Sequence, residues 1–157
     1  MDEKELIAFI VFAKKNGYAN KEGATEIIKY EKSGAVKIIV RKEDWEYTDK
    51  YVGSESFIGQ EVVYYKGKPM WSMSYHGRVF ATDEDMKTKL TAFLKNALLN
   101  VSEESLYRGP RIHIDTEFTY INTFHGELNF FSGEEMISKK SANSVLYELR
   151  YHGGNII

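Results

Sequence analysis

The sequence contains similar blocks twice in the same order, and this pattern limits the fold more than any other feature. The segment FIGQE (57–61) is echoed by FSGEE (131–135), and YHG (75–77) is echoed by YHG (151–153). Repetition of several blocks in one order is the usual mark of a structural repeat. The chain is therefore expected to contain one supersecondary unit twice.

Two further pairs of blocks extend the repeat towards the amino terminus. LIAFIVFA (6–13) resembles LTAFLKNA (90–97), and the pattern Y-x3-Y-x-G beginning at Tyr47 resembles Y-x3-F-x-G beginning at Tyr120. We interpret this as an internal duplication, with copies at about residues 1–78 and 84–157. Because each copy alone is small for a stable fold, the two copies are expected to share a core in a single domain, 1–157.

Each copy begins with a segment of helical periodicity and continues with segments rich in β-branched and aromatic residues. The predicted helices are 2–16 and 83–99, and the predicted strands are 24–30, 35–41, 43–52, 57–65, 69–76, 112–124, 127–137 and 145–152. Strands that follow a helix as a group predict an α+β fold with antiparallel pairing. The duplication predicts pseudo-twofold symmetry, as one continuous curved sheet or as two sheets face to face, with any cleft where the copies meet.

Composition and charge exclude several classes of protein. The net charge of −2 and the absence of a Lys/Arg run give no reason to expect direct nucleic-acid binding. The chain has no cysteine, which excludes disulfides and thiolate chemistry. The start is acidic and the apolar run 6–13 is too short to span a bilayer, so we expect a soluble cytoplasmic protein without membrane contact.

Two glutamates interrupt the apolar faces of the predicted strands. Because side chains alternate along a strand, Glu61 and Glu135 share a face with Tyr75 and Tyr151, respectively. A buried carboxylate needs hydrogen-bond donors, a cation or its own proton. The two tyrosines are candidate donors, and the candidate cations are Arg108, Arg111 and Arg150.

These carboxylates have a functional and a structural interpretation. They could recognise a ligand or move a proton, or they could accept hydrogen bonds that fix the strand register. The occurrence of the motif in both copies favours the structural role, because active sites usually survive in one copy.

Other residue patterns carry weaker signals. Aromatic residues near the first hairpin, including Tyr51 and Trp71, could stack on a planar ligand or simply pack the core. Asp49-x-Tyr51 could line a pocket. His76 and His152 are expected on the opposite face from the glutamates, and no histidine spacing predicts a metal site. No cofactor is expected.

Several of these motifs together resemble a known family. They are Y-x-G (51–53), F-x-G-x-E (57–61), P-x-W-x-M-x-Y-x-G (69–77), RGP (108–110), F-x-G-x-E (131–135) and YHGG (151–154). The set resembles a small prokaryotic domain family of unknown function, found alone or fused behind helix-turn-helix transcriptional regulators. The resemblance covers nearly the whole chain, although residues 21–32 depart from the family pattern. It implies a sensor or assembly module and supplies no catalytic residues.

Our principal hypothesis is therefore a non-catalytic ligand-binding or interaction domain, with a small molecule and a second copy of the chain as candidate partners. The candidate ligand-binding residues are Tyr51, Glu61, Trp71, Tyr75, Arg108, Glu135 and Tyr151. The alternatives are a small hydrolase that uses Glu61 or Glu135 as an acid or base, and a homodimer module that pairs exposed edge strands.

Overall fold

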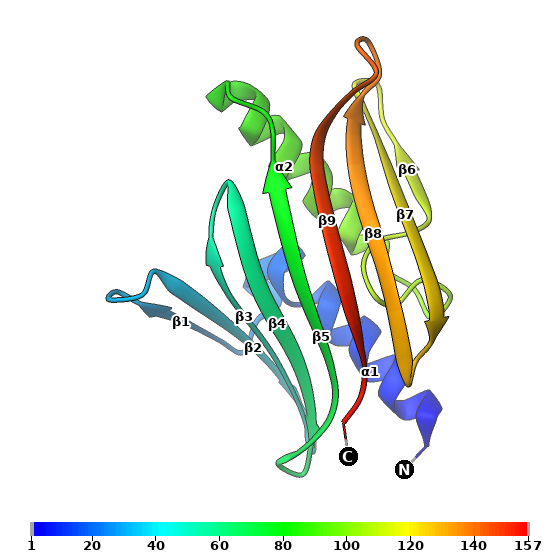
Figure 1. Ribbon diagram of the computed structural model, residues 1–157. Coiled ribbons are helices and arrows are strands. Elements are labelled where there is room, and N and C mark those ends of the chain that lie inside the picture. The colour runs from blue at the N-terminus through cyan, green and yellow to red at the C-terminus, as the bar shows by residue number, and fades with distance from the viewer. Residues whose placement is uncertain (1, 157) are drawn as a thin grey trace.

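The computed structural model describes residues 2–156 and shows one large antiparallel sheet with its helices gathered on one face (Figure 1). The elements are α1 (Glu3–Lys15), the 3-10 helix η1 (Tyr18–Gly23), β1 (Glu26–Tyr30), β2 (Ala35–Lys42), β3 (Trp45–Gly53), β4 (Ser56–Tyr65), β5 (Lys68–Val79), α2 (Glu84–Leu99), β6 (Ile112–Ile114), β7 (Phe118–Glu127), β8 (Phe130–Lys139) and β9 (Ser144–Asn155). The α+β class with antiparallel pairing is confirmed.

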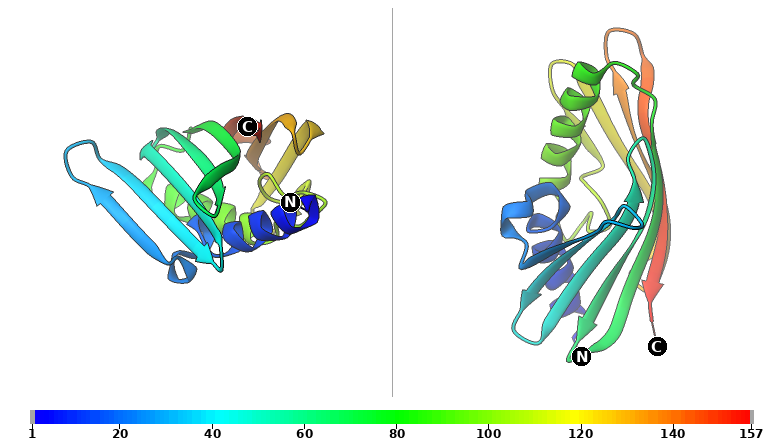
Figure 2. Two further views of the ribbon diagram at one scale, coloured as in Figure 1. Left: turned by 90° about the horizontal axis from the view of Figure 1, so that it is seen from below. Right: turned by 90° about the vertical axis from the view of Figure 1, so that its left-hand side faces the viewer.

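Both α-helices begin at a capping aspartate and bury one apolar stripe. Asp2 accepts a hydrogen bond from the backbone N–H of Lys4, and Asp83 accepts one from that of Met86. In α1 the buried stripe is Leu6, Phe9, Ile10 and Ala13, and in α2 it is Leu90, Phe93, Leu94, Ala97 and Leu98. The views of Figure 2 show the sheet curving around these helices, so the core lies on its concave face.

The strand order explains how the two halves of the chain join. The order is β1-β2-β3-β4-β5-β9-β8-β7-β6, so β5 of the first half pairs directly with β9 of the second. Tyr75 lies opposite Tyr151 at this seam. The sheet is continuous, so of the two arrangements that the sequence left open, the single curved sheet is observed and the pair of facing sheets is not.

The structure corrects the predicted strand at 112–124, which is two strands rather than one. The carboxylate of Asp115 accepts hydrogen bonds at 2.7 Å from the backbone N–H groups of Glu117 and Phe118, and the chain turns there. Strands β6 and β7 then pair as a hairpin. The helix η1 was not predicted, and β5 and β9 each extend three residues beyond their predicted ends.

Alternation along β4 and β8 places both glutamates in the core, as predicted. Glu61 is 2% exposed and Glu135 is 0% exposed, on the same face as Val63 and Ile137. His76 and His152 lie exposed on the other face. The concave face therefore combines an apolar core with a central group of charged side chains.

Candidate functional site

Glu135 is held by donors from three parts of the chain. Arg108 donates to Oε1 from Nε at 3.0 Å and from Nη2 at 2.7 Å. The Tyr147 hydroxyl donates to the same oxygen at 2.7 Å, and the Tyr120 hydroxyl donates to Oε2 at 2.6 Å. Burial and the charge of Glu135 raise the pKa of both tyrosines well above the ordinary value, so both hydroxyls keep their protons and remain donors.

Glu61 has a different partner, supplied by the first helix. Lys14 Nζ lies 2.5 Å from Glu61 Oε2 and also donates to the backbone carbonyl of Tyr107 at 2.6 Å. Burial lowers the pKa of Lys14, and the negative charge of Glu61 opposes that shift. Arg108 Nη1 lies 3.9 Å from Glu61 Oε1, so this arginine bridges the two glutamates.

Asp49 is the third buried carboxyl group of the cluster. It lies opposite Glu61 in the β3–β4 register and is 3% exposed. The Tyr75 hydroxyl donates to Oδ1 at 2.6 Å. Burial and then the charge of Glu61 raise the pKa of Asp49 to about 7, although the Tyr75 hydrogen bond and nearby cations act in the opposite direction.

The cluster balances its charges only when Asp49 is protonated. Lys14 and Arg108 supply two positive charges, and Glu61 and Glu135 supply two negative ones. Asp49 is the remaining carboxyl group, and it is poised to gain or lose a proton near neutral pH. Such a group beside a cavity is a candidate for ligand contact.

A cavity of about 360 Å³, here called the inner pocket, opens between the sheet and α2 beside this cluster. Its polar lining includes Asp49 and Arg108 from the buried cluster. The lining residues are Tyr18, Lys21, Asp49, Tyr51, Gly53, Ser54, Phe57, Tyr75, Val79, Leu90, Thr91, Leu94, Lys95, Arg108 and Tyr147. The size and the mixture of aromatic, aliphatic and few polar groups are typical of small-molecule sites.

Two lysines gather around Tyr18 at the inner pocket. Lys21 Nζ lies 5.6 Å from the centroid of the Tyr18 ring, and Lys95 Nζ lies 5.5 Å from it. Lys21 also donates to the Tyr51 hydroxyl at 3.3 Å. Tyr18 and Tyr51 meet edge to face, with centroids 6.1 Å apart. This side of the pocket is therefore aromatic and positively charged.

The structure brings only some of the predicted site residues together. Tyr51, Tyr75 and Arg108 line the inner pocket, and Glu61 lines a cavity of about 30 Å³ that shares Asp49 and Arg108 with it. The other three predicted residues do not line the inner pocket.

These three residues have other surroundings. Glu135 is enclosed behind Arg108, as described above. Trp71 is fully buried and stacks on Phe131 with centroids 5.6 Å apart. The Tyr151 hydroxyl donates to Asn122 Oδ1 at 2.7 Å.

The predicted donors and cations need correction. Tyr75 and Tyr151 donate to Asp49 and Asn122, not to the glutamates, because the hydroxyls reach across to β3 and β7. Of the three candidate arginines, Arg108 pairs with Glu135. Arg150 lies on the outer face near Glu134, and Arg111 stacks on Phe124.

The sequence analysis missed Lys14 and gave Asp49 little weight. Both positions carried a signal. Lys14 follows the buried Ile10 by four residues, so it shares the buried stripe of α1. Asp49 alternates with Trp45 and Tyr47 in β3, which places its carboxylate on the core face by the reasoning applied to the glutamates.

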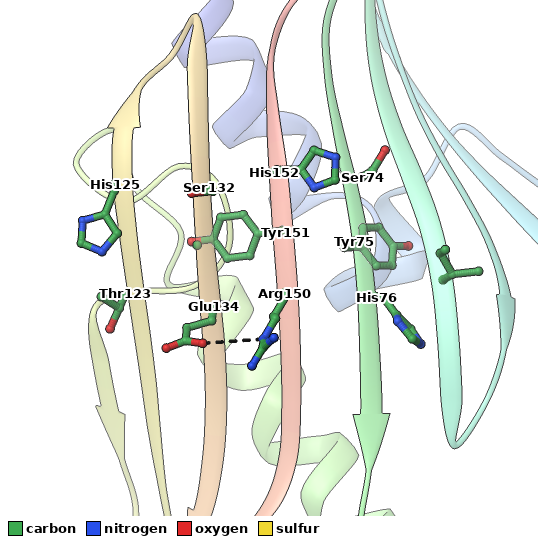
Figure 3. Close-up of a pocket in the computed structure, with 12 residues that line it drawn as sticks. Ser74, Tyr75, His76, Thr123, His125, Ser132, Glu134, Arg150, Tyr151 and His152 are labelled. Carbon is green, nitrogen blue, oxygen red and sulfur yellow. Dashed lines mark ion pairs between the residues drawn. The ribbon is translucent and has the colours of Figure 1, made fainter.

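A second hollow of about 480 Å³, here called the outer groove, crosses the opposite face of the central strands. Figure 3 shows His76, Arg150, His152 and Ser132 there, with Arg150 Nε 3.9 Å from Glu134 Oε2. The Arg150 side chain is 81% exposed. The charged and histidine side chains of the outer groove are exposed, whereas the inner pocket reaches buried ionisable groups. The inner pocket is therefore the better candidate site.

Metal sites and membrane-spanning helices are two further features to consider in residues 2–156, the part of the chain that the structure describes. No group of three or more histidine, aspartate or glutamate residues in this part of the chain could hold a metal ion. Within the same residues no helix combines the length and the apolar character needed to cross a membrane.

The fold and the site define an α+β domain with a pocket between its sheet and its helices. Residues 49–156 match the family model described as a domain of unknown function, DUF5680, and the chain belongs to this family. No match was found among curated proteins or among solved structures.

Proposed function

We propose that this protein is a binding module for a small organic molecule and that the ligand occupies the inner pocket. The observation that carries the proposal is the presence of two buried ionisable groups, Asp49 and Arg108, in the lining of a cavity of about 360 Å³. Burying charge without function is costly, and such groups gather where ligands bind. The resemblance noted above supports the further proposal that the module acts as a sensor.

The internal duplication, which stays a proposal, supports this choice of site. The last strand of each half lies at the centre of the sheet and the earlier strands follow outwards in order, as two copies joined at β5 and β9 would produce. Asp49 and Asn122 hold matching positions, since each lies opposite a buried glutamate and accepts a tyrosine hydroxyl. In the helix blocks, Lys14 corresponds to Leu98. The glutamates thus recur as scaffold, whereas Asp49 and Lys14 occur in one half only.

A variant that fills the inner pocket tests the proposal. Thr91 lines the pocket from α2 and is exposed, so Thr91→Trp should occupy the cavity without disturbing the core. Compounds from a metabolite library that raise the melting temperature of the wild type should fail to stabilise this variant. The matched control is Ile58→Trp, which fills the outer groove and should leave those shifts unchanged. If ligand shifts survive Thr91→Trp, or vanish in Ile58→Trp, ligands do not bind in the inner pocket.

The alternative function is a small carboxylate-dependent hydrolase. Glu135 accepts from Arg108, Tyr120 and Tyr147, and Glu61 pairs with Lys14. Neither glutamate lines the inner pocket, so neither presents a carboxylate to a substrate there. Asp49, with its pKa of about 7, is the better acid or base for this alternative. Hydrolysis of 4-nitrophenyl esters that is lost in Asp49→Asn but kept in Glu134→Gln would favour the enzyme. Absence of turnover above the buffer rate would exclude it for esters.

A further inference from the structure

The inner pocket has positively charged side chains at one place, which suit an anionic ligand group, and a carboxyl group at another, which suits a hydrogen-bond donor. Lys21 and Lys95 both line the inner pocket and lie within 5.6 Å of the centroid of the Tyr18 ring, so this side of the pocket carries two positive charges. Among the described residues neither lysine belongs to an ion pair, in contrast to Lys14 and Lys87. A ligand carboxylate at this side of the pocket would offset these positive charges and accept charge-assisted hydrogen bonds from the ammonium groups.

The buried end of the pocket offers an acceptor instead. The Tyr75 hydroxyl occupies Asp49 Oδ1, and the Asp49 carboxyl group lines the inner pocket, so Oδ2 is available to a ligand. Arg108 also lines the pocket, but its Nε and Nη2 groups donate to Glu135 and are not available to a ligand. An ionised Asp49 in this position binds a hydrogen-bond donor such as a hydroxyl or amino group.

The walls between these two ends are flat and mainly apolar. Phe57 and Tyr147 stack with centroids 6.3 Å apart, and Leu90 and Leu94 of α2 cover the pocket from the helix side. Aromatic side chains favour a planar ligand body that they can contact face or edge on.

Building on the proposed function, we propose that the ligand is a small aromatic carboxylic acid that carries a hydroxyl or amino donor at its other end. Lys21 and Lys95 bind the carboxylate, the aromatic walls contact the ring, and Asp49 accepts the hydrogen bond of the donor. The first half of the sheet has the carboxyl group of Asp49 where the second half has the amide of Asn122. Recognition of the ligand's donor group is therefore assigned to the first half.

The test compares probes that differ in one group at a time. The probes are 4-hydroxybenzoate, 4-hydroxyphenylacetate and 3-(4-hydroxyphenyl)propionate, which vary the distance between donor and carboxylate. Each is paired with its 4-methoxy analogue, which lacks the donor, and with the corresponding neutral alcohol, which lacks the carboxylate. Dissociation constants are measured by titration calorimetry of the full chain at pH 8, where Asp49 is ionised.

For at least one length, the hydroxy acid should bind about tenfold more tightly than either analogue, because each comparison removes a hydrogen bond to a charged group. Asp49→Ala should abolish the preference for hydroxy over methoxy acids. Lys21→Met with Lys95→Met should abolish the preference for acids over alcohols. Lys37→Met with Lys66→Met changes the net charge equally away from the pocket and should change neither preference.

Each part of the proposal can fail separately. Equal affinity for hydroxy and methoxy acids overturns the role of Asp49, and equal affinity for acids and alcohols overturns the role of the lysines. If no acid of any length binds, the ligand class is wrong. The proposed function is then judged by the Thr91→Trp and Ile58→Trp experiment, which requires no assumption about the ligand.

Discussion

At the scale of single residues, the two halves of the sheet differ in one buried side chain, which is a carboxylic acid in the first half and an amide in the second. Asp49 and Asn122 accept hydrogen bonds from equivalent tyrosines at 2.6 and 2.7 Å, yet only Asp49 can carry a charge. Its raised pKa means that folding favours the protonated form. The folded state therefore binds more protons than the unfolded state between the unfolded pKa of 3.8 and about pH 7, and Asp49 makes stability fall as pH rises through this range.

Exchange of the two side chains tests this linkage. Asp49→Asn should raise the melting temperature relative to the wild type at pH 8, and the difference should shrink as pH falls and disappear below the unfolded pKa of 3.8, where Asp49 is protonated in both states. Asn122→Asp should have the opposite effect, because it places a carboxylate opposite Glu135. Calorimetry from about pH 3 to pH 9 checks both variants. A pH-independent difference for Asp49→Asn would contradict the assigned pKa.

Removal of the charge of Glu135 should show that this residue is scaffold. Glu135→Gln leaves the buried Arg108 without its closest counter-ion and should reduce the free energy of unfolding by about 3 kcal/mol. The control, Glu134→Gln, alters an exposed side chain on the adjacent position and should change stability by less than about 0.5 kcal/mol. Urea denaturation measures both. A cost as small as that of the control would mean that the buried pair does not stabilise the fold.

At the scale of the elements, a glycine in β4, Gly59, makes room for the ring of Tyr75, which lines the inner pocket. Gly59 lies opposite Tyr75, and a Cβ atom at Gly59 would lie 2.5 Å from the Cζ atom of that tyrosine. Gly133 and Tyr151 repeat the arrangement in β8 and β9. The glycines therefore allow the tyrosine rings to lie across the neighbouring strand and reach Asp49 and Asn122.

Gly59→Ala should displace Tyr75 and break its hydrogen bond to Asp49. The overlap should cost about 2 kcal/mol of stability, the usual range for overpacking a core. It should also weaken the binding of any ligand that occupies the inner pocket. Gln60→Ala changes the next residue of β4, whose side chain bonds to Ser72 on the outer face, and should have neither effect. Denaturation measures the loss of stability, and ligand titration of the same preparations measures the affinity. Unchanged ligand affinity in Gly59→Ala would mean that the position of Tyr75 does not affect ligand binding.

The elements also show what the sequence could and could not predict. Periodicity identified both helices and the buried faces of β4 and β8, because local patterns report which side of an element meets the core. The hairpin of β6 and β7 escaped notice, since the turn depends on the backbone contacts of a single aspartate. The partners of the glutamates could not be predicted from strand alternation, because Lys14 and Arg108 come from a helix and a connector. Their positions depend on how these segments pack over the sheet.

At the scale of the whole molecule, the two halves of the chain join at the middle of the sheet and share one core. Strands β5 and β9 each have a hydrogen-bonded neighbour on both sides, whereas β1 and β6 form the two edges. Ile112 and Ile114 of β6 are 58% and 52% exposed. Stability should therefore be greatest at the centre of the sheet and least at its edges.

Hydrogen exchange should reveal this gradient. The amides of β5 and β9 should exchange most slowly, through global unfolding, and those of β1 and β6 should exchange earliest among the strands. Mass spectrometry of peptides from the exchanged protein gives the order. Slow exchange throughout β1 or β6 would contradict it and would indicate that a second chain covers that edge.

The central position of β9 has a consequence for biosynthesis. Strand β5 is complete at Val79, but the neighbour that covers its free edge begins only at Ser144. During the translation of the intervening segment, a nascent chain presents an uncovered strand that can pair with other nascent chains. We expect chaperone dependence and misassembly between chains on one polysome to be concentrated in this interval and to end once the last strand leaves the ribosome.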